Sequence, residues 1–469
     1  MAGVAAGHPA TAQVGADILA AGGTAADAAV AAVLTACVGE TIMTGLGGGG
    51  FAIYFEAATG QVTCLDFFCA VPGTDRDRPA EPMRPIPVSF GAVPLAYEIG
   101  GASVGVPGVP AGCGELHRRY GRLPWSEVVA PAIALARCGV PLPAMHAAAL
   151  PSVAPALTVG PGARVYAPEG DLLGPGDLLY HPGLADALTT LAAEGPATFY
   201  TGAVAQTLVA AVRGDGGALG PADLAGYRVL VQPARTARLA GRTVLARSDL
   251  NRTVATVAAL PGDLAALDRP RRAVALAGAL ASRDRGGHGE TTNVSVLDRH
   301  GNACVVTTSL GIGSGVWLPG LGVHLNSMLG EGELRGPGEP DPGSRMSSMM
   351  CPMVVLDAAG RVELALGSAG ASRIRTAILH TLLGVLLDAV DVPDAVALPR
   401  FHVATGGGRA VAHAEPDLPG DECAALAAAG YELNRWQRRN HYFGGVSAVG
   451  PAGAAGDPRR DGVGLMVAA

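Results

Sequence analysis

An adjacent pair of threonines follows a glycine-rich loop in the segment 286-GGHGETTNVSVLDRHGN-302. Alternating apolar residues after the pair predict a strand, so Thr291 and Thr292 stand at a loop-to-strand junction. A threonine hydroxyl is a weak nucleophile until a base takes its proton. If the chain were cut before Thr291, the new α-amine, with a pKa of about 7.7–8.0, would supply that base. The pair therefore indicates either an ordinary strand start or a self-activating nucleophile.

The Thr291 hydroxyl can make this cut by attacking the carbonyl of Glu290, in an N-to-O acyl shift that hydrolysis then completes. The products would be a large subunit of residues 1–290 and a small subunit of residues 291–469, together forming one compact domain. His288 is a candidate to assist the self-cleavage. The structural alternative is simpler, because threonine favours strands and turn edges in any protein.

The strand that begins at Thr291 is expected to form a hairpin with the next strand. Asp298 and Gly301 are the first and fourth residues of the connecting turn, where a type I turn prefers them. A left-handed Gly301 would give a three-residue loop with a bulge. This register places Ser309 across from Thr291 on the same face of the sheet.

The rest of the pattern is that of a mixed α/β chain. It predicts two helices within residues 10–38 with Thr24 as an N-cap, a strand at 51–56, helices at 262–283 and 373–388, and a strand at 361–366. The loop 45-GLGGGG-50 lacks the Gly-Lys-Ser/Thr ending of a phosphate-binding loop, so close backbone packing is the better interpretation. The loop 367-GSAGAS-372 exposes backbone N–H groups at a helix start, a ready site for negative charge.

Composition excludes several classes of protein. The 469 residues carry a formal net charge of −7 without a basic cluster, which argues against a nucleic-acid partner. No window resembles a membrane span or a secretory signal, so we expect a cytoplasmic protein. The eight cysteines are scattered, which favours buried thiols over disulfides. No metal-binding spacing is present, and no cofactor is expected.

Taken together, the chain resembles the γ-glutamyltranspeptidase family of N-terminal-nucleophile hydrolases. The motifs that carry the resemblance occur in the family's order and include PATAQVGADILAAGGTAADAAVAA, MTGLGGGGFAIYF, TTNVSVLDRHGNACVVTTSL, LNSML, RMSSMMCPMVVL, GSAGASRIRTAILH, LPRFHV and DPRRDGVG. The resemblance implies an α/β fold, the four-layer αββα sandwich, acting on a small-molecule substrate after cleavage into a large and a small subunit.

The resemblance also implies roles for individual residues. Thr291 matches the nucleophile and new N-terminus, and Ser309 matches a threonine that hydrogen-bonds the nucleophile's amine. The backbone N–H groups of Gly370 and Ala371 match the oxyanion hole. In the substrate pocket the matching positions are Asn326, Ser347 and Ser348, with Met349 in place of the second serine if the alignment starts from Pro352.

The expected donor pocket departs from the family pattern. Phe68 stands where the family carries an arginine that clamps the donor's α-carboxylate, and a hydrophobe cannot bind a carboxylate. Asn293 replaces a histidine, and Gly311 replaces an asparagine. The acidic pair that grips the donor's amine is missing, although Glu331 is a possible substitute. The family's Ser-Ser-Gly-Gly segment reads 248-SDLNRT-253.

These departures favour a self-processing hydrolase with an altered substrate, used in secondary metabolism. Some relatives in actinobacterial pathways to 4-alkylproline antibiotics hydrolyse a carbon–carbon bond, and that reaction is one alternative. A true γ-glutamyl hydrolase or transpeptidase is a second alternative. An uncleaved homologue without enzymatic activity is the third.

Overall fold

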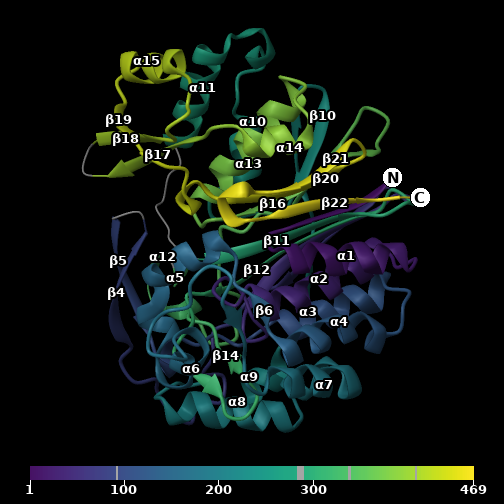
Figure 1. Ribbon diagram of the computed structural model, residues 1–469, viewed down its shortest axis with the longest axis vertical. Helices are drawn as coiled ribbons and strands as arrows, with labels where there is room; N and C mark the ends of the chain where they lie inside the picture. The colour runs from purple at the N-terminus through teal and green to yellow at the C-terminus, as the bar shows by residue number, and fades with distance from the viewer. Residues whose placement is uncertain (91–92, 282–289, 336–337, 339, 407–408, 469) are drawn as a thin grey trace.

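Two stacked β-sheets form the centre of the computed structural model, which describes residues 1–90, 93–281, 290–335, 338, 340–406 and 409–468 (Figure 1). The larger sheet contains, in spatial order, β22 (Val463–Val467), β1 (Ala2–Ala6), β11 (Glu290–Leu297), β12 (Ala303–Gly311), β2 (Gly49–Glu56), β3 (Gln61–Phe67) and β8 (Leu230–Gln232). The second sheet contains β21 (Gly453–Gly456), β20 (Gly445–Gly450), β16 (Val362–Ala369), β15 (Met353–Leu356), β10 (Arg242–Ala246) and β9 (Arg235–Leu239). All neighbouring strands in both sheets are antiparallel.

Helices cover both outer faces of the sheet pair. α1 (Pro9–Ala20), α2 (Ala25–Gly39) and α3 (Val109–Tyr120) pack on the larger sheet, whereas α13 (Arg373–Leu386) and α14 (Val392–Ala397) pack on the second (Figure 1). The expected four-layer αββα sandwich is therefore confirmed.

The remaining elements surround this sandwich. The helices are α4 (Trp125–Cys138), α5 (Ala144–Leu157), α6 (Ala163–Tyr166), α7 (Leu184–Glu194), α8 (Ala203–Gly214), α9 (Pro221–Gly226), α10 (Thr253–Ala258), α11 (Arg269–Ala281), α12 (Gly332–Arg335) and α15 (Gly420–Ala428). The smaller sheets pair β4 (Arg84–Phe90) with β5 (Val93–Ile99), β6 (Val140–Pro141) with β7 (Leu178–Leu179), β13 (Trp317–Leu318) with β14 (Val323–His324), and join β17 (Phe401–Gly406), β18 (Arg409–Ala414) and β19 (Glu432–Arg435).

Local sequence explains where several helices begin. Thr24 caps α2 as expected, in a reciprocal pair with Asp27 that satisfies two backbone N–H groups at the helix start. Helix α11 begins at Arg269, later than the predicted 262, because Pro270 in its first turn has a backbone angle that suits a helix start. Residues 264–266 form a separate 3-10 turn.

The strand periodicity divides β11 and β12 between two environments. Val294 and Val296 belong to the core beneath the helices of the larger sheet, and Val305 belongs to the core between the two sheets. Because side chains alternate along a strand, odd-numbered residues of both strands face the second sheet. Thr291 and Ser309 therefore face the space between the sheets.

A buried ion network joins two motifs that are far apart in the sequence. Arg400 of LPRFHV lies 2.7 Å from Asp457 of DPRRDGVG, and Arg459 pairs with both Asp457, at 3.1 Å, and Glu415. All four side chains are buried. These motifs therefore stabilise the packing around α14 and β17.

The sequence predicts free, buried cysteines, and seven of the eight fit this description. All eight are free and seven are buried, while Cys138 is exposed at the end of α4. Within the described ranges, no helix combines the length and apolar character that crossing a bilayer requires. The same residues contain no cluster of three or more His, Cys, Asp or Glu side chains that could hold a metal ion.

Candidate active site

The hairpin of β11 and β12 places Thr291 at the entrance of the space between the sheets. Gly301 adopts a left-handed φ of 84°, the Asp298 N–H donates to the Asn302 carbonyl, and Leu297 pairs with Ala303. The predicted turn is therefore confirmed, and the predicted register is confirmed from Leu297 back to Thr292. The register continues to Thr292, opposite Thr308, and then shifts so that Glu290 pairs with Gly311. One extra residue of β12 therefore bulges beside Thr291.

The bulge keeps Ser309 next to the threonine. The Ser309 hydroxyl accepts a hydrogen bond from the Gly311 N–H at 3.0 Å, and Gly311 has a positive φ of 69°. Thr291 and Ser309 are both buried and both line one cavity. The hydroxyl that the sequence predicts opposite Thr291 is therefore present on the same face.

This catalytic cavity is small and mostly apolar. It has a volume of about 20 Å³, and its walls are Phe68, Thr291, Ser309, Met328, Glu331, Leu334, Ser348, Met349, Met350, Ala371 and Ile374. A space of this size holds about one water molecule. Its methionine side chains can adapt to the shape of a substrate, because methionine is unbranched and flexible.

The loop between β16 and α13 contributes Ala371 to this cavity. Gly370 and Ala371 adopt positive φ angles of 113° and 50°, which is costly for an alanine. Among the described residues, neither backbone N–H has a hydrogen-bond acceptor. An oxyanion hole requires backbone N–H groups close to the reacting hydroxyl, and Ala371 lines the same cavity as Thr291. Asn251 fixes the loop by donating to the Ala371 carbonyl at 3.2 Å.

On the opposite face of β11, Thr292 is held by a buried carboxylate. Its hydroxyl and that of Thr11 both donate to Glu40, at the C-terminal end of α2. Burial raises the pKa of Glu40, although these two hydrogen bonds and the charge of Arg460 act in the opposite direction. This anchor fixes the backbone next to Thr291, and the sequence analysis did not identify it.

Phe68 closes one wall of the cavity. It is fully buried and stacks on Phe51 with ring centroids 5.3 Å apart. Arg247 lies over the Phe51 ring, 3.6 Å from its centroid. The position that carries a clamping arginine in the family pattern is therefore part of an aromatic wall, with no cationic side chain of its own.

Of the other residues predicted for the substrate pocket, three line the cavity and two do not. Ser348, Met349 and Glu331 line the cavity, whereas Ser347 is exposed and does not. The placement thus favours the alignment that pairs Ser348 with Met349. Asn326 is buried outside the cavity, where its amide donates to the carbonyls of Gly47 and Gly105 at 2.7 and 2.8 Å.

Asn293 and the glycine loop both help to hold the fold around the site. The Asn293 side chain accepts from the Thr307 hydroxyl at 2.7 Å and donates to Ser295 at 2.9 Å, so it joins β11 to β12. In the glycine loop, a Cβ on Gly48 would lie 2.3 Å from the Ser309 carbonyl, so the loop requires glycine for close packing beneath the site. Glu290 is described as the first residue of β11, and His288 lies outside the described residues.

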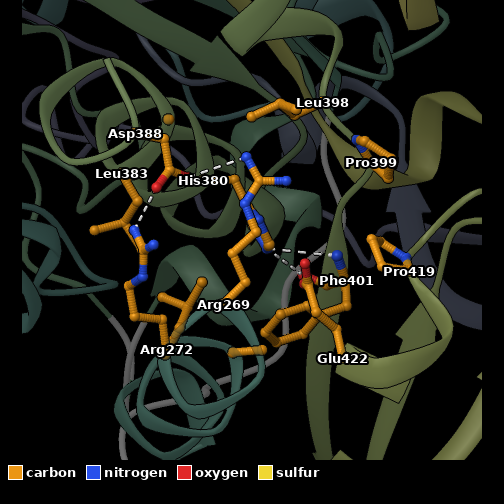
Figure 2. A pocket seen from close by; sticks show the side chains of 13 residues that line it. Arg269, Arg272, His380, Leu383, Asp388, Leu398, Pro399, Phe401, Pro419 and Glu422 are labelled. Atoms are coloured by element: carbon orange, nitrogen blue, oxygen red, sulfur yellow. Dashed lines mark hydrogen bonds and ion pairs between the residues drawn. The ribbon is translucent and has the colours of Figure 1, made fainter. Parts of the chain in front are cut away.

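A second cavity, between α11, α13 and α15, is separate from this chemistry (Figure 2). Its volume is about 90 Å³. Asp388 binds Arg272 at 2.5 Å and Arg269 at 3.6 Å, and the His380 ring contacts the Phe401 carbonyl at 3.0 Å. None of the predicted site residues lines this cavity, and both of its arginines are engaged with Asp388.

Comparison with known proteins agrees with the fold. The profile of the gamma-glutamyltranspeptidase family matches residues 11–262 and 265–467, so the chain belongs to this family. It is 29% identical to glutathione hydrolase proenzyme 1 of Schizosaccharomyces pombe, over 83% of this chain and 72% of that protein. It is 30% identical to the acylase ACY 1 proenzyme of Pseudomonas sp. strain SE83, over 94% of this chain and 88% of that protein.

Among solved structures, the cephalosporin acylase of Bacillus halodurans aligns with a TM-score of 0.81 at 22% identity, over all of this chain and 96% of that one. This likeness concerns the fold. Together with the family membership, it defines the chain as a γ-glutamyltranspeptidase-like enzyme of the N-terminal-nucleophile hydrolase class.

Proposed function

We propose that the protein cleaves itself between Glu290 and Thr291 and then hydrolyses a small substrate that carries an apolar acyl group. The observation that carries this proposal is the composition of one cavity. Thr291, Ser309 and Ala371 line it together with Phe68 and Met349, in place of a cationic clamp. The reacting groups of the family would thus face a mostly apolar pocket, with Glu331 and Ser348 as its other polar residues.

In the proposed reaction, the Thr291 hydroxyl gives its proton to the freed α-amine as its oxygen bonds to the substrate carbonyl. The N–H groups of Gly370 and Ala371 stabilise the resulting oxyanion, each by about 3 kcal/mol. The leaving group takes the proton from the amine and departs, leaving an ester on Thr291. Water then attacks this ester, and the acid product and free threonine are released.

The Thr291→Ala variant tests this proposal. We expect it to remain a single polypeptide and to lack turnover, because both steps need the hydroxyl. Thr291→Ser is the matched control, since it keeps a hydroxyl and should be processed and active at a reduced rate. A Thr291→Ala protein that still splits at the 290/291 bond would refute self-cleavage by this residue.

The substrate part of the proposal is tested with anilides of different acyl groups. Wild-type protein should hydrolyse an apolar acyl anilide faster than a γ-glutamyl anilide, because Phe68 offers no partner for the γ-glutamyl α-carboxylate. Brisk hydrolysis of γ-glutamyl anilides would instead support the true γ-glutamyl hydrolase. A carbon–carbon hydrolase is the second candidate, since the apolar pocket and the acyl-enzyme suit it equally. A cytoplasmic role in secondary metabolism is part of the proposal.

A further inference from the structure

An open groove of about 600 Å³ lies between β9, β10 and α10. Three arginines line it, Arg235, Arg247 and Arg252, against one carboxylate, Asp249. Both oxygens of Asp249 are engaged, because the Thr253 N–H donates at 2.7 Å and the Thr253 hydroxyl donates as well. The groove therefore has an excess of positive charge in a protein whose net charge is −7.

Arg247 lies at the base of this groove with part of its guanidinium unpaired. Its side chain is 8% exposed, and one terminal nitrogen donates to the carbonyls of Ser348 and Met350 at 3.2 and 2.9 Å. Its Nε has no hydrogen-bond partner among the described residues. Burying an incompletely paired guanidinium is unfavourable. Because Arg247 lines the groove, an anion bound there would lie beside this charge and offset part of that cost.

The other two arginines are exposed and available. Within the described parts of the chain, neither Arg235 nor Arg252 forms an ion pair. Arg252 also adopts a left-handed φ of 54°. Non-glycine residues in this conformation are uncommon and often mark binding sites.

The groove backs onto the wall of the catalytic cavity. Ser348 and Met350, whose carbonyls bind Arg247, line that cavity, and Arg247 covers Phe51, which stacks on Phe68. The same segment carries Asn251, which fixes the oxyanion loop. An anion bound in the groove would thus lie next to the residues that shape the catalytic cavity.

We propose that this groove binds the carboxylate or phosphate group of a small molecule, with Arg235, Arg247 and Arg252 as its partners. The anionic group is either a distal part of the substrate or a free anion that binds beside the reaction. The substrate assignment rests on the proposed function, whereas the binding site itself does not.

Calorimetric titration with inorganic phosphate, and separately with succinate, tests the site. We expect the double variant Arg235→Gln/Arg252→Gln to bind at least about tenfold more weakly than wild type, since each arginine can donate charge-assisted hydrogen bonds to an anion. Arg238→Gln is the matched control, because Arg238 is exposed on β9 but does not line the groove. Equal binding by wild type and the double variant, or no binding by wild type, would overturn the proposal.

Kinetics then identify the source of the anion. If it belongs to the substrate, the double variant raises KM for a carboxylate-bearing amide and leaves KM for its neutral analogue unchanged. If the groove binds a free anion, phosphate raises the thermal unfolding midpoint of wild type but not of the double variant. This result should be the same whether the carboxylate-bearing amide or its neutral analogue is present. The Thr291→Ala protein should bind phosphate like wild type, so a failure of the proposed catalysis is distinguishable from a failure of this site.

Discussion

At the scale of single residues, the site consists of two hydroxyls on adjacent strands and one aromatic wall. In that wall, Phe68 stands at the position where the family pattern has an arginine. Thr291 and Ser309 share a face because both are odd-numbered in a register centred on the turn at Gly301. Phe68 forms one wall of the catalytic cavity and packs on Phe51. The two hydroxyls of the family pattern are thus retained, whereas the residue at the position of the clamping arginine has changed.

Ser309 offers a test of the contact with the amine. Ser309→Ala should reduce kcat by about ten- to hundredfold, because a hydrogen bond to a group that becomes charged is worth about 1.5–3 kcal/mol. Ser309→Thr, which keeps the hydroxyl, should restore most of the rate. The pH profile of kcat should shift in the alanine variant alone. An unchanged rate and profile for Ser309→Ala would exclude this contact.

At the scale of elements, the loop between β16 and α13 places Ala371 in the wall of the cavity at the expense of an unfavourable backbone conformation. Ala371 has φ 50°, a region that glycine occupies without steric cost. The helix start after it and the Asn251 hydrogen bond hold this conformation.

Ala371→Gly tests the strain in this loop. The variant should increase the free energy of unfolding by up to about 1 kcal/mol, since left-handed alanine costs about 1–2 kcal/mol and glycine gives some of this back as chain entropy. Turnover should persist because the amide remains. Ala369→Gly in the regular strand β16 is the control and should lower stability. Urea denaturation measures both, and a destabilised Ala371→Gly protein would contradict the strained geometry.

The turn residues and the alternation of apolar residues predict the hairpin of β11 and β12, but they do not predict the β-bulge in it. Asp298 and Gly301 encode the turn, and the alternation of β11 fixes which residues face the second sheet. The shift between Thr292 and Glu290 was missed, although Gly311 near the end of a strand is a known signal for a bulge. Helix α11 was predicted too long because apolar periodicity does not distinguish a helix from the preceding 3-10 turn.

At the scale of the whole molecule, the catalytic cavity draws on segments distant in sequence, from Phe68 after β3 to Ala371 after β16. Periodicity indicates which residues are buried, but not which strands become neighbours. Placing Phe68, Ser348 and Ala371 in one site therefore needed the family resemblance. The Glu40 anchor and Arg247 carry no local signal, since their partners are hydroxyls and carbonyls from other elements.

The buried ion network predicts how stability depends on pH. Burial acts to raise the pKa of Asp457, but the charges of Arg400 and Arg459 outweigh it and lower the pKa below 3.8. A carboxyl group with a lowered pKa stabilises the fold above its unfolded pKa, and this contribution is lost as the pH falls through the folded value. Stability from Asp457 should therefore be complete at neutral pH and decline below about pH 4.

Asp457→Asn should lower the free energy of unfolding at pH 7 by about 3–5 kcal/mol, because it leaves buried arginines without their partner. The acid-side slope of stability should also become shallower. Glu432→Gln is the control, since its pair with Arg409, at 3.6 Å, is largely exposed and should contribute little. Equal stability of the Asp457→Asn and wild-type proteins across this pH range would contradict the role of the network.

The central claim is that the protein creates its own catalytic amine by cutting one peptide bond. Intact-mass analysis with N-terminal sequencing of freshly purified wild-type protein tests this most directly. The account predicts two polypeptides, residues 1–290 and 291–469, with the second beginning Thr-Thr-Asn. A single uncut chain that nevertheless shows full hydrolytic turnover would contradict it.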